Sequence, residues 1–473
     1  MEPHGAQADP SPVSFTKGHV GRSVLAWPWP VGTGGGAIVG IALCLMTAHA
    51  WGQEGPRAGG REQPPATEPA PFPPSPGPPI GAYPLELLGL LAPPAQRGPV
   101  TLTPSISVSE EYNDNLFFDN RNRQWDLITG LSPALTLFVT RSSYQLSGGY
   151  SFTAEMYDRN TRLNNALEHQ NFVASGLYRA MPGLTLTASD AYTLDRSTNR
   201  LATQGFATGR QESWSNTFAP GLTWQMTPLT SLNLGATYSI LRFKGAGAEG
   251  VGTGAGTGTG SGMDSDTYGF STTLGHVLTP RLTGLIGYGF TYLDVRGEES
   301  SRTHTPTLGG SYRFTPSLTG TVSGGPAITE LGRQTIMSPA GTASLVQLLR
   351  TGSASVQYTR AVSAAGGLGG TTDSQSASGT LTLSTWQRGL LIVVNPVYSI
   401  AESVSSRQTD RIDVKSMTLT LGVTYQLARY VSLFGGYTLF QQRTGTTSSS
   451  GQADADQNRV RFGLQFGYPI NFD

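Results

Sequence analysis

Histidines are the side chains of this chain best suited to acid–base chemistry, and each of them needs a partner to act. A serine-type hydrolase pairs a histidine with an acid and with a nucleophile. Three of the six histidines lie in the first 50 residues, and the others are His169, His276 and His304. His169 closes a long polar stretch, where we expect a solvated side chain, and His276 lies on the apolar side of an alternating segment. No acid or nucleophile is spaced to meet them, so the sequence predicts no catalytic residue and no enzyme.

Oxygen ligands gather between Glu110 and Asn115, with Asp119 and Asn120 close behind. Such clusters can hold Ca²⁺, but this one lacks the regular spacing of an EF-hand loop. Asn and Asp are also favoured in turns, which is the interpretation we prefer. The Gly-rich stretch 245–262 precedes no helix, so it does not form a phosphate-binding loop. The sequence therefore predicts no metal and no cofactor.

The composition excludes other classes of protein. Hydrophobic residues make up 37% of the 473 residues and charged residues only 13%, while 61 glycines and 31 prolines occur. Soluble proteins carry about 25% charged residues. A formal net charge of zero removes the basic field that nucleic acid requires.

The last segment alternates without an error. The apolar positions are Val460, Phe462, Leu464, Phe466, Tyr468, Ile470 and Phe472. Period-two alternation predicts a β-strand with one apolar and one polar face. A strand of this length, with aromatic residues on one face, is typical of a transmembrane β-barrel. Barrels of the bacterial outer membrane commonly finish with an aromatic residue, and here Asp473 follows Phe472.

Connections between the alternating segments are of two kinds. Short Pro-containing turns recur, as in Thr279–Thr283 and Thr315–Thr319. The long polar stretches are 157–169, 196–212, 244–265, 331–341, 403–412 and 444–457. Outer-membrane barrels have short periplasmic turns and long extracellular loops. We therefore predict an all-β, antiparallel up-and-down barrel of about 18 strands, or 16 because 334–349 is ambiguous. An even count leaves both ends on the periplasmic side, with the last strand against the first near Ile106 and Val108.

Three regions follow from this interpretation. Residues 1–50 read as a signal peptide with an extended n-region, because an apolar run at 37–46 precedes Ala48-His49-Ala50. A lipoprotein site at Cys44 is the rival, and Leu43 before the cysteine fits it poorly. Residues 51–99 form a Pro/Gly-rich periplasmic linker whose apolar island, 85–91, either plugs the barrel or is a patch in an extended leader. Residues 100–473 form the barrel.

The lumen-facing positions are mostly Ser, Thr, Gly, Ala and Gln, which leaves the interior open. Arg459 and Arg461 lie on the lumen side of the last strand. They either favour anionic solutes or pair with acidic lumen residues.

The first predicted strand ends in a motif that carries a family resemblance. The motif is Glu111-Tyr112-Asn113-Asp114-Asn115-Leu116-Phe117, followed by Asp126 and by Leu131–Leu135. This pattern resembles the β-barrel porin 2 family over roughly residues 100 to 472. The resemblance implies a bacterial outer-membrane protein, in a family often discussed beside exopolysaccharide or capsule export.

Two functions remain open at this stage. The first is a porin-like channel for polar solutes, including a link to polysaccharide export. The second is a non-conducting structural or accessory barrel that binds surface polysaccharide or a partner protein. Both place the chain in the outer membrane, with the lipid bilayer and the barrel-assembly machinery as partners. A soluble, carbohydrate-binding β-sandwich is a distant third.

Overall fold

A computed structural model describes residues 99–196, 212–244, 264–297, 299–364, 371–384, 389–404, 413–444 and 454–472. All of them belong to one compact unit, Glu68–Asp473. The expected signal peptide, the linker before residue 99, the island 85–91, the Gly-rich stretch 245–262 and Asp473 lie outside the described residues.

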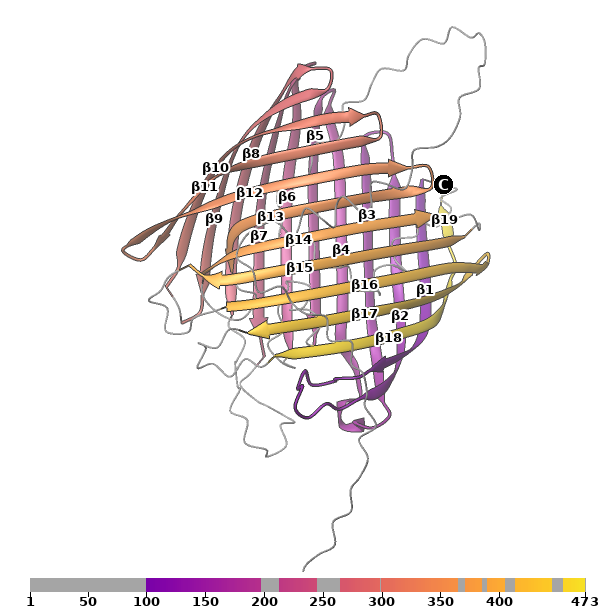
Figure 1. Cartoon of the computed structure of the whole chain (residues 1–473). Coiled ribbons are helices and arrows are strands. Elements are labelled where there is room, and N and C mark those ends of the chain that lie inside the picture. The colour runs from indigo at the N-terminus through magenta and orange to yellow at the C-terminus, as the bar shows by residue number, and fades with distance from the viewer. Residues whose placement is uncertain are drawn as a thin grey trace, which may run out of the picture. The chain divides into compact units, whose positions relative to one another are not determined.

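The described residues form one antiparallel sheet of strands in sequence order (Figure 1). The strands are β1 Val100–Asn113, β2 Asp126–Thr140, β3 Tyr144–Tyr157, β4 Asn165–Met181, β5 Leu184–Asp195, β6 Ser213–Thr227, β7 Thr230–Phe243, β8 Ser265–Thr279, β9 Leu282–Val295, β10 Ser301–Thr315, β11 Leu318–Leu331, β12 Gln334–Leu349, β13 Gly352–Ala364, β14 Thr371–Ser384, β15 Leu390–Ser403, β16 Asp413–Ala428, β17 Val431–Thr444, β18 Ala455–Gly467 and β19 Ile470–Phe472.

The sheet closes on itself where β1 pairs with β18. Ile106 faces Phe466 and Val108 faces Leu464 across this seam, as predicted. The prediction of a closed, antiparallel, 18-strand β-barrel is thus confirmed, with β19 as a continuation of β18. Among the described residues, the helical structure is one 3₁₀ turn, Thr161–Leu163. Within those same ranges, no helix has the length and apolarity needed to cross a membrane.

The terminal strand is interrupted once. Proline has no N–H to donate to a ladder, and the pairing stops at Gly467, two residues before Pro469. It resumes in β19, where Phe472 faces Val100. The predicted alternation therefore continues across the break, with Ile470 and Phe472 both exposed.

Two kinds of connection lie at opposite ends of the barrel. One end of the barrel contains the start of β1 and the end of β19. Every second connection lies at this end, from β2–β3 to β16–β17, and these connections have two to five residues. At the other end, those from β1–β2 to β17–β18 have two to 21 residues. One predicted loop, 331–341, is wrong. Gly332, at φ +56°, makes a tight turn, and β12 begins at Gln334.

The strands present two faces of opposite character. On β1, the side chains of Ile106 and Val108 are 44% and 51% exposed, whereas the alternate residue Ser109 is 3% exposed. Residues paired across an antiparallel ladder share a face, so the exposed apolar side chains trace one outer surface around the barrel. A closed barrel with an apolar outer surface is one of the two structures that can span a membrane.

Candidate functional site

Small hydroxyl side chains line part of the inner wall of the barrel, most densely on β14. The inward positions of β14 are all Ser or Thr: Thr372, Ser374, Ser376, Ser378, Thr380, Thr382 and Ser384. On β5, the inward residues Thr187, Ser189 and Ala191 are exposed, so water reaches this part of the wall. Hydroxyl groups solvate polar solutes without binding them tightly, as the lining of a channel must.

Arg459 and Arg461 lie on the inner face of β18. Arg459 Nη1 is 3.6 Å from Glu111 Oε1. The Arg461 Nε and Nη2 atoms donate to Ser109 Oγ at 3.1 and 3.0 Å, and only 8% of this residue is exposed. Gly130 on β2 leaves the space for this arrangement, since a Cβ there would lie 2.9 Å from Ser109 Oγ. Both arginines therefore hold the seam from within, and Arg459 has the acidic partner that the sequence allowed.

The amides of the family motif close the inner side of the same seam. Gln457 Nε2 donates to Asn113 Oδ1 at 3.0 Å and to the Asn115 carbonyl at 2.9 Å. The Asn115 Nδ2 atom donates to the Asp456 carbonyl at 2.8 Å, and its Oδ1 accepts from the Asp119 N–H. These side chains are buried, so each of these bonds compensates for lost hydration. The motif residues thus fasten β18 to β1.

Carboxylates on the outer side of the seam complete the fastening. Asp114 accepts from the Asn458 N–H at 2.6 Å and from Asn458 Nδ2 at 2.8 Å. Asp456 binds Arg443 Nη1 at 2.6 Å, and Arg123 lies 3.4 Å from both Asp114 and Asp456. This charged network lies at the end of the barrel that has the longer loops.

Glu111 and Tyr112, the remaining motif residues, lie on opposite faces. Glu111 faces the lumen and pairs with Arg459, as described above. Tyr112 faces outward, with its ring 6.0 Å from that of Trp125. The Arg159 guanidinium lies 3.6 Å from the Trp125 ring centre. Aromatic and cationic side chains of this kind are typical of the interface between membrane and water.

The loop that joins β1 to β2 folds against the inner wall. Leu116 packs with Ile128, Tyr157 and Leu163 on one side of the seam. On the other side, Phe118 packs with Phe440 and Ala455. The Phe118 and Phe440 ring centres are 5.5 Å apart. Phe118 also has a φ of +57°, which a bulky residue adopts only where its surroundings hold it there. Side chains of this loop thus cover part of the inner wall at the end with the longer loops.

A buried cluster of ionisable side chains lies next to this loop and was missed by the sequence analysis. His169 Nδ1 is 2.7 Å from Asp195 Oδ1, and Nε2 is 3.0 Å from Glu155 Oε2. The Tyr157 hydroxyl donates to Glu155, and Tyr157 also packs against Leu116. His169 is 7% exposed, so the expectation of a solvated residue is wrong. The available signal was the inward parity of charged residues on β3, β4 and β5.

The cluster does not have the geometry of a hydrolase. In a catalytic triad, one imidazole nitrogen faces an acid and the other faces a nucleophilic hydroxyl. Here both nitrogens of His169 face carboxylates. His276 and His304 lie on the outer face, where their Nδ1 atoms contact Thr230 Oγ1 at 2.9 Å and the Tyr288 hydroxyl at 2.7 Å. The Glu155–His169–Asp195 cluster therefore places charged groups on the inner face of the barrel.

The carboxylates considered for a metal have separate partners. Glu110 accepts from Thr129 on the outer face, and Asp119 accepts from the N–H groups of Arg121 and Asn122. Asp114 and Glu111 belong to the two sides of the seam. In the described part of the chain, no three His, Cys, Asp or Glu residues converge as metal ligands would.

No family model matches the sequence, and no curated protein matches it. Among solved structures, it is similar to OccAB4 of Acinetobacter baumannii, at 12% identity and a TM-score of 0.40, over 80% of this chain and 99% of that one. It is also similar to OpdQ of Pseudomonas aeruginosa, at 12% identity and a TM-score of 0.39, over 78% and 99% of the two chains. The siderophore receptor PirA of Pseudomonas aeruginosa matches at 9% identity and a TM-score of 0.37, over 80% and 81%. With likenesses this distant, the assignment as a barrel depends on the strand pairing described above.

Proposed function

We propose that this chain is a channel of the bacterial outer membrane that passes small polar solutes. A signal peptide at residues 1–50 would direct it across the inner membrane, residues 51–99 would form a periplasmic linker, and the assembly machinery would insert the barrel. The β-barrel porin 2 family is the family that the Glu111–Phe117 motif suggests.

The observation that carries the proposal is the contrast between the two faces of the wall. The inward positions of β14 are all hydroxyl side chains, and inward residues of β5 are exposed to water. Barrels of 16–18 strands enclose an aqueous lumen unless a loop or a segment fills it.

Selection would occur where the β1–β2 loop narrows the lumen. The charged groups nearby are Glu155, His169, Asp195, the Glu111–Arg459 pair and Arg461, which is only 8% exposed and donates to Ser109. With Glu155 and Asp195 ionised, the His169 cluster carries a net negative charge whether or not the histidine is protonated. We therefore expect a preference for cations over anions.

Recordings from the refolded full chain in a planar lipid bilayer test the proposal. We expect discrete conductance steps and a reversal potential that favours cations. A variant lacking residues 52–98 separates an obstructed lumen from the absence of a pore. If neither protein conducts, the channel proposal is wrong.

One observation favours the alternative, a barrel closed by its own loop. Leu116 and Phe118 anchor the β1–β2 loop on both sides of the seam, so the mouth is occupied. Such a barrel would serve as an accessory to surface polysaccharide, which is the role that the family resemblance implies. Deletion of the gene would then alter the surface polysaccharide and leave the permeability to small solutes unchanged.

A further inference from the structure

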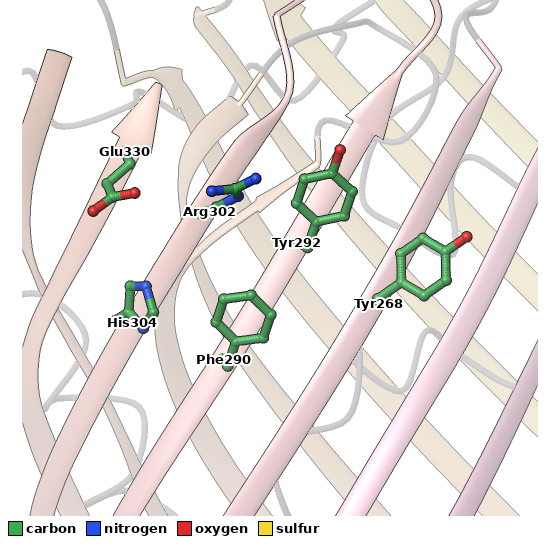
Figure 2. A pocket seen from close by; sticks show the side chains of 6 residues that line it. All are labelled: Tyr268, Phe290, Tyr292, Arg302, His304 and Glu330. Atoms are coloured by element: carbon green, nitrogen blue, oxygen red, sulfur yellow. The ribbon is translucent and has the colours of Figure 1, made fainter. Parts of the chain in front are cut away.

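We propose that the outer surface of β8–β11 binds the phosphorylated sugar headgroup of an outer-leaflet glycolipid. The residues concerned form a shallow hollow of about 570 Å³, lined by Tyr268, Phe290, Tyr292, Arg302, His304 and Glu330 (Figure 2). This inference rests on the proposed outer-membrane location, and it concerns the outside of the barrel instead of the lumen.

The register places the hollow on the lipid-facing side. Tyr268 faces Tyr292, Tyr292 faces Arg302, and Arg302 faces Glu330 across successive ladders. All of these positions therefore share one face of the sheet. Further along the same face, Ile286 is 60% exposed, Leu308 70% and Val322 62%, a surface suited to acyl chains.

The hollow also lies at the height of the outer-leaflet headgroups. Arg302 is the second residue of β10, and Glu330 is the last but one residue of β11. Both lie at the end with the longer loops, which is extracellular in an outer-membrane barrel.

The positive charge of Arg302 is the feature of the hollow that favours an anionic ligand. Among the described residues, Arg302 forms no salt bridge under a 4.0 Å limit, although Glu330 is its cross-strand neighbour. Its guanidinium lies 5.8 Å from the Tyr292 ring centre. Arginine binds phosphate through two parallel hydrogen bonds, and a phosphate at this height is the headgroup of a lipid.

Other outward arginines at the same end have partners already. Arg242 Nη2 is 2.5 Å from Asp266 Oδ2, and Arg360 donates to both oxygens of Asp373 at 3.2 and 2.7 Å. Arg302 thus differs from these arginines because its guanidinium has no carboxylate partner within the described strands and can bind an anion. Arg242 and Arg360 therefore provide matched controls.

Aromatic rings beside Arg302 supply a platform for a sugar. Tyr238 and Tyr268 stack with ring centres 4.7 Å apart, and Tyr292 continues the row at 6.0 Å from Tyr268. Phe290 lies 5.1 Å from the His304 ring. Flat aromatic faces pack against the C–H faces of sugars, and tyrosine also offers a hydroxyl at the wet edge of the membrane. A phosphate on a sugar matches this combination of arginine and rings, whereas a glycerol phosphate headgroup matches the arginine alone.

Binding of bisphosphorylated lipid A to the full-length mature protein in detergent, followed by native mass spectrometry, tests the inference. Phosphatidylglycerol, which has the charge without the sugar, is the comparison probe. We expect lipid A to bind the more tightly, and R302Q to weaken its binding by about fivefold, as for a lost charge-assisted bond. E330Q removes a repelling charge and should strengthen binding by about twofold.

R360Q is the matched control and should stay within about twofold of the wild type, because its arginine is already paired. Equal losses in R302Q and R360Q, or equal binding of the two lipids, would overturn the inference. Dimerisation through this face, with no lipid A bound, would overturn it as well. Conductance of the same preparations distinguishes the two proposals, since R302Q should conduct like the wild type. Lipid A binding without conductance would count against the channel alone.

Discussion

At the scale of single residues, the Glu111–Phe117 motif joins the first and last strands at the seam of the barrel. The residue types of Asn113, Asp114 and Asn115 indicate a turn at the end of a strand, and β1 ends at Asn113. Their partners, Gln457, Asn458 and Asp456, lie more than 330 residues away in sequence. A local sequence pattern does not show which remote residues will be hydrogen-bond partners. The sequence therefore identified these polar residues but not their role at the seam. His169 was misplaced because it follows a long polar stretch, whereas its two acids lie on the neighbouring strands β3 and β5.

Replacement of His169 should change both the stability of the barrel and the charge of its lumen. In H169Q, the carboxylates of Glu155 and Asp195 would lose the group between them and repel each other. We expect a barrel less stable by about 1–3 kcal/mol, since buried groups lose partners. Urea titration of folded barrel, followed by gel mobility, measures this loss. The cation preference from reversal potentials should rise.

The double variant E155Q/H169Q is the control for that prediction. It removes one carboxylate together with the histidine and should restore part of the stability. A cation preference that H169Q leaves unchanged would mean that His169 presents no positive charge to the solute path.

At the scale of elements, strand pattern and turn chemistry predicted most of the wall. The error at 331–341 has a physical source. Ser338-Pro339-Ala340-Gly341 has the composition of a loop, yet Pro339 lies in β12 and faces Pro326 of β11. Each proline lacks one N–H donor, and their pairing places both missing donors at one point of the ladder. In the β1–β2 loop, the sequence did not show which apolar residues would be buried. Leu116 was read only as part of a motif, but Leu116 and Phe118 both pack against the inner wall.

Detaching the β1–β2 loop should widen the mouth of the barrel. In the double variant L116A/F118A, the loop loses both hydrophobic contacts, each worth about 2–5 kcal/mol for side chains of this size. We expect a larger single-channel conductance and more current noise than in the wild type. L229A, at an exposed turn between β6 and β7, is the control for a general loss of apolar surface. An unchanged conductance in L116A/F118A would place the narrowest point elsewhere.

At the scale of the whole molecule, one alternation governs both the fold and the function. Apolar side chains outside and hydroxyl groups inside follow from a single period of two, which is why the sequence predicted the closed barrel and its strand number. The alternation did not predict the lining of the lumen mouth or the outer hollow, because both depend on which strand ends lie side by side.

Cysteine pairs across the seam check the closure of the barrel directly. Val108 and Leu464 face each other in the register, so V108C/L464C should cross-link on mild oxidation. V108C/F462C places the thiols one diagonal apart, about 7–8 Å, and should cross-link poorly. A C44S background avoids the native thiol, and gel mobility with and without reductant reads the result. Cross-linking in the second pair but not in the first would contradict the seam described here.

The polar seam also has a consequence for how the barrel assembles. Its hydrogen bonds join the two ends of the chain, so they form only after the strands between them are in place, and pairings this remote in sequence form slowly. Until they form, Asn113, Gln457 and Arg461 lack the partners that justify their burial, and a barrel closed out of register would leave them unsatisfied. We therefore expect damage to this network to slow or prevent maturation of the barrel, an effect that should appear before any change in the current.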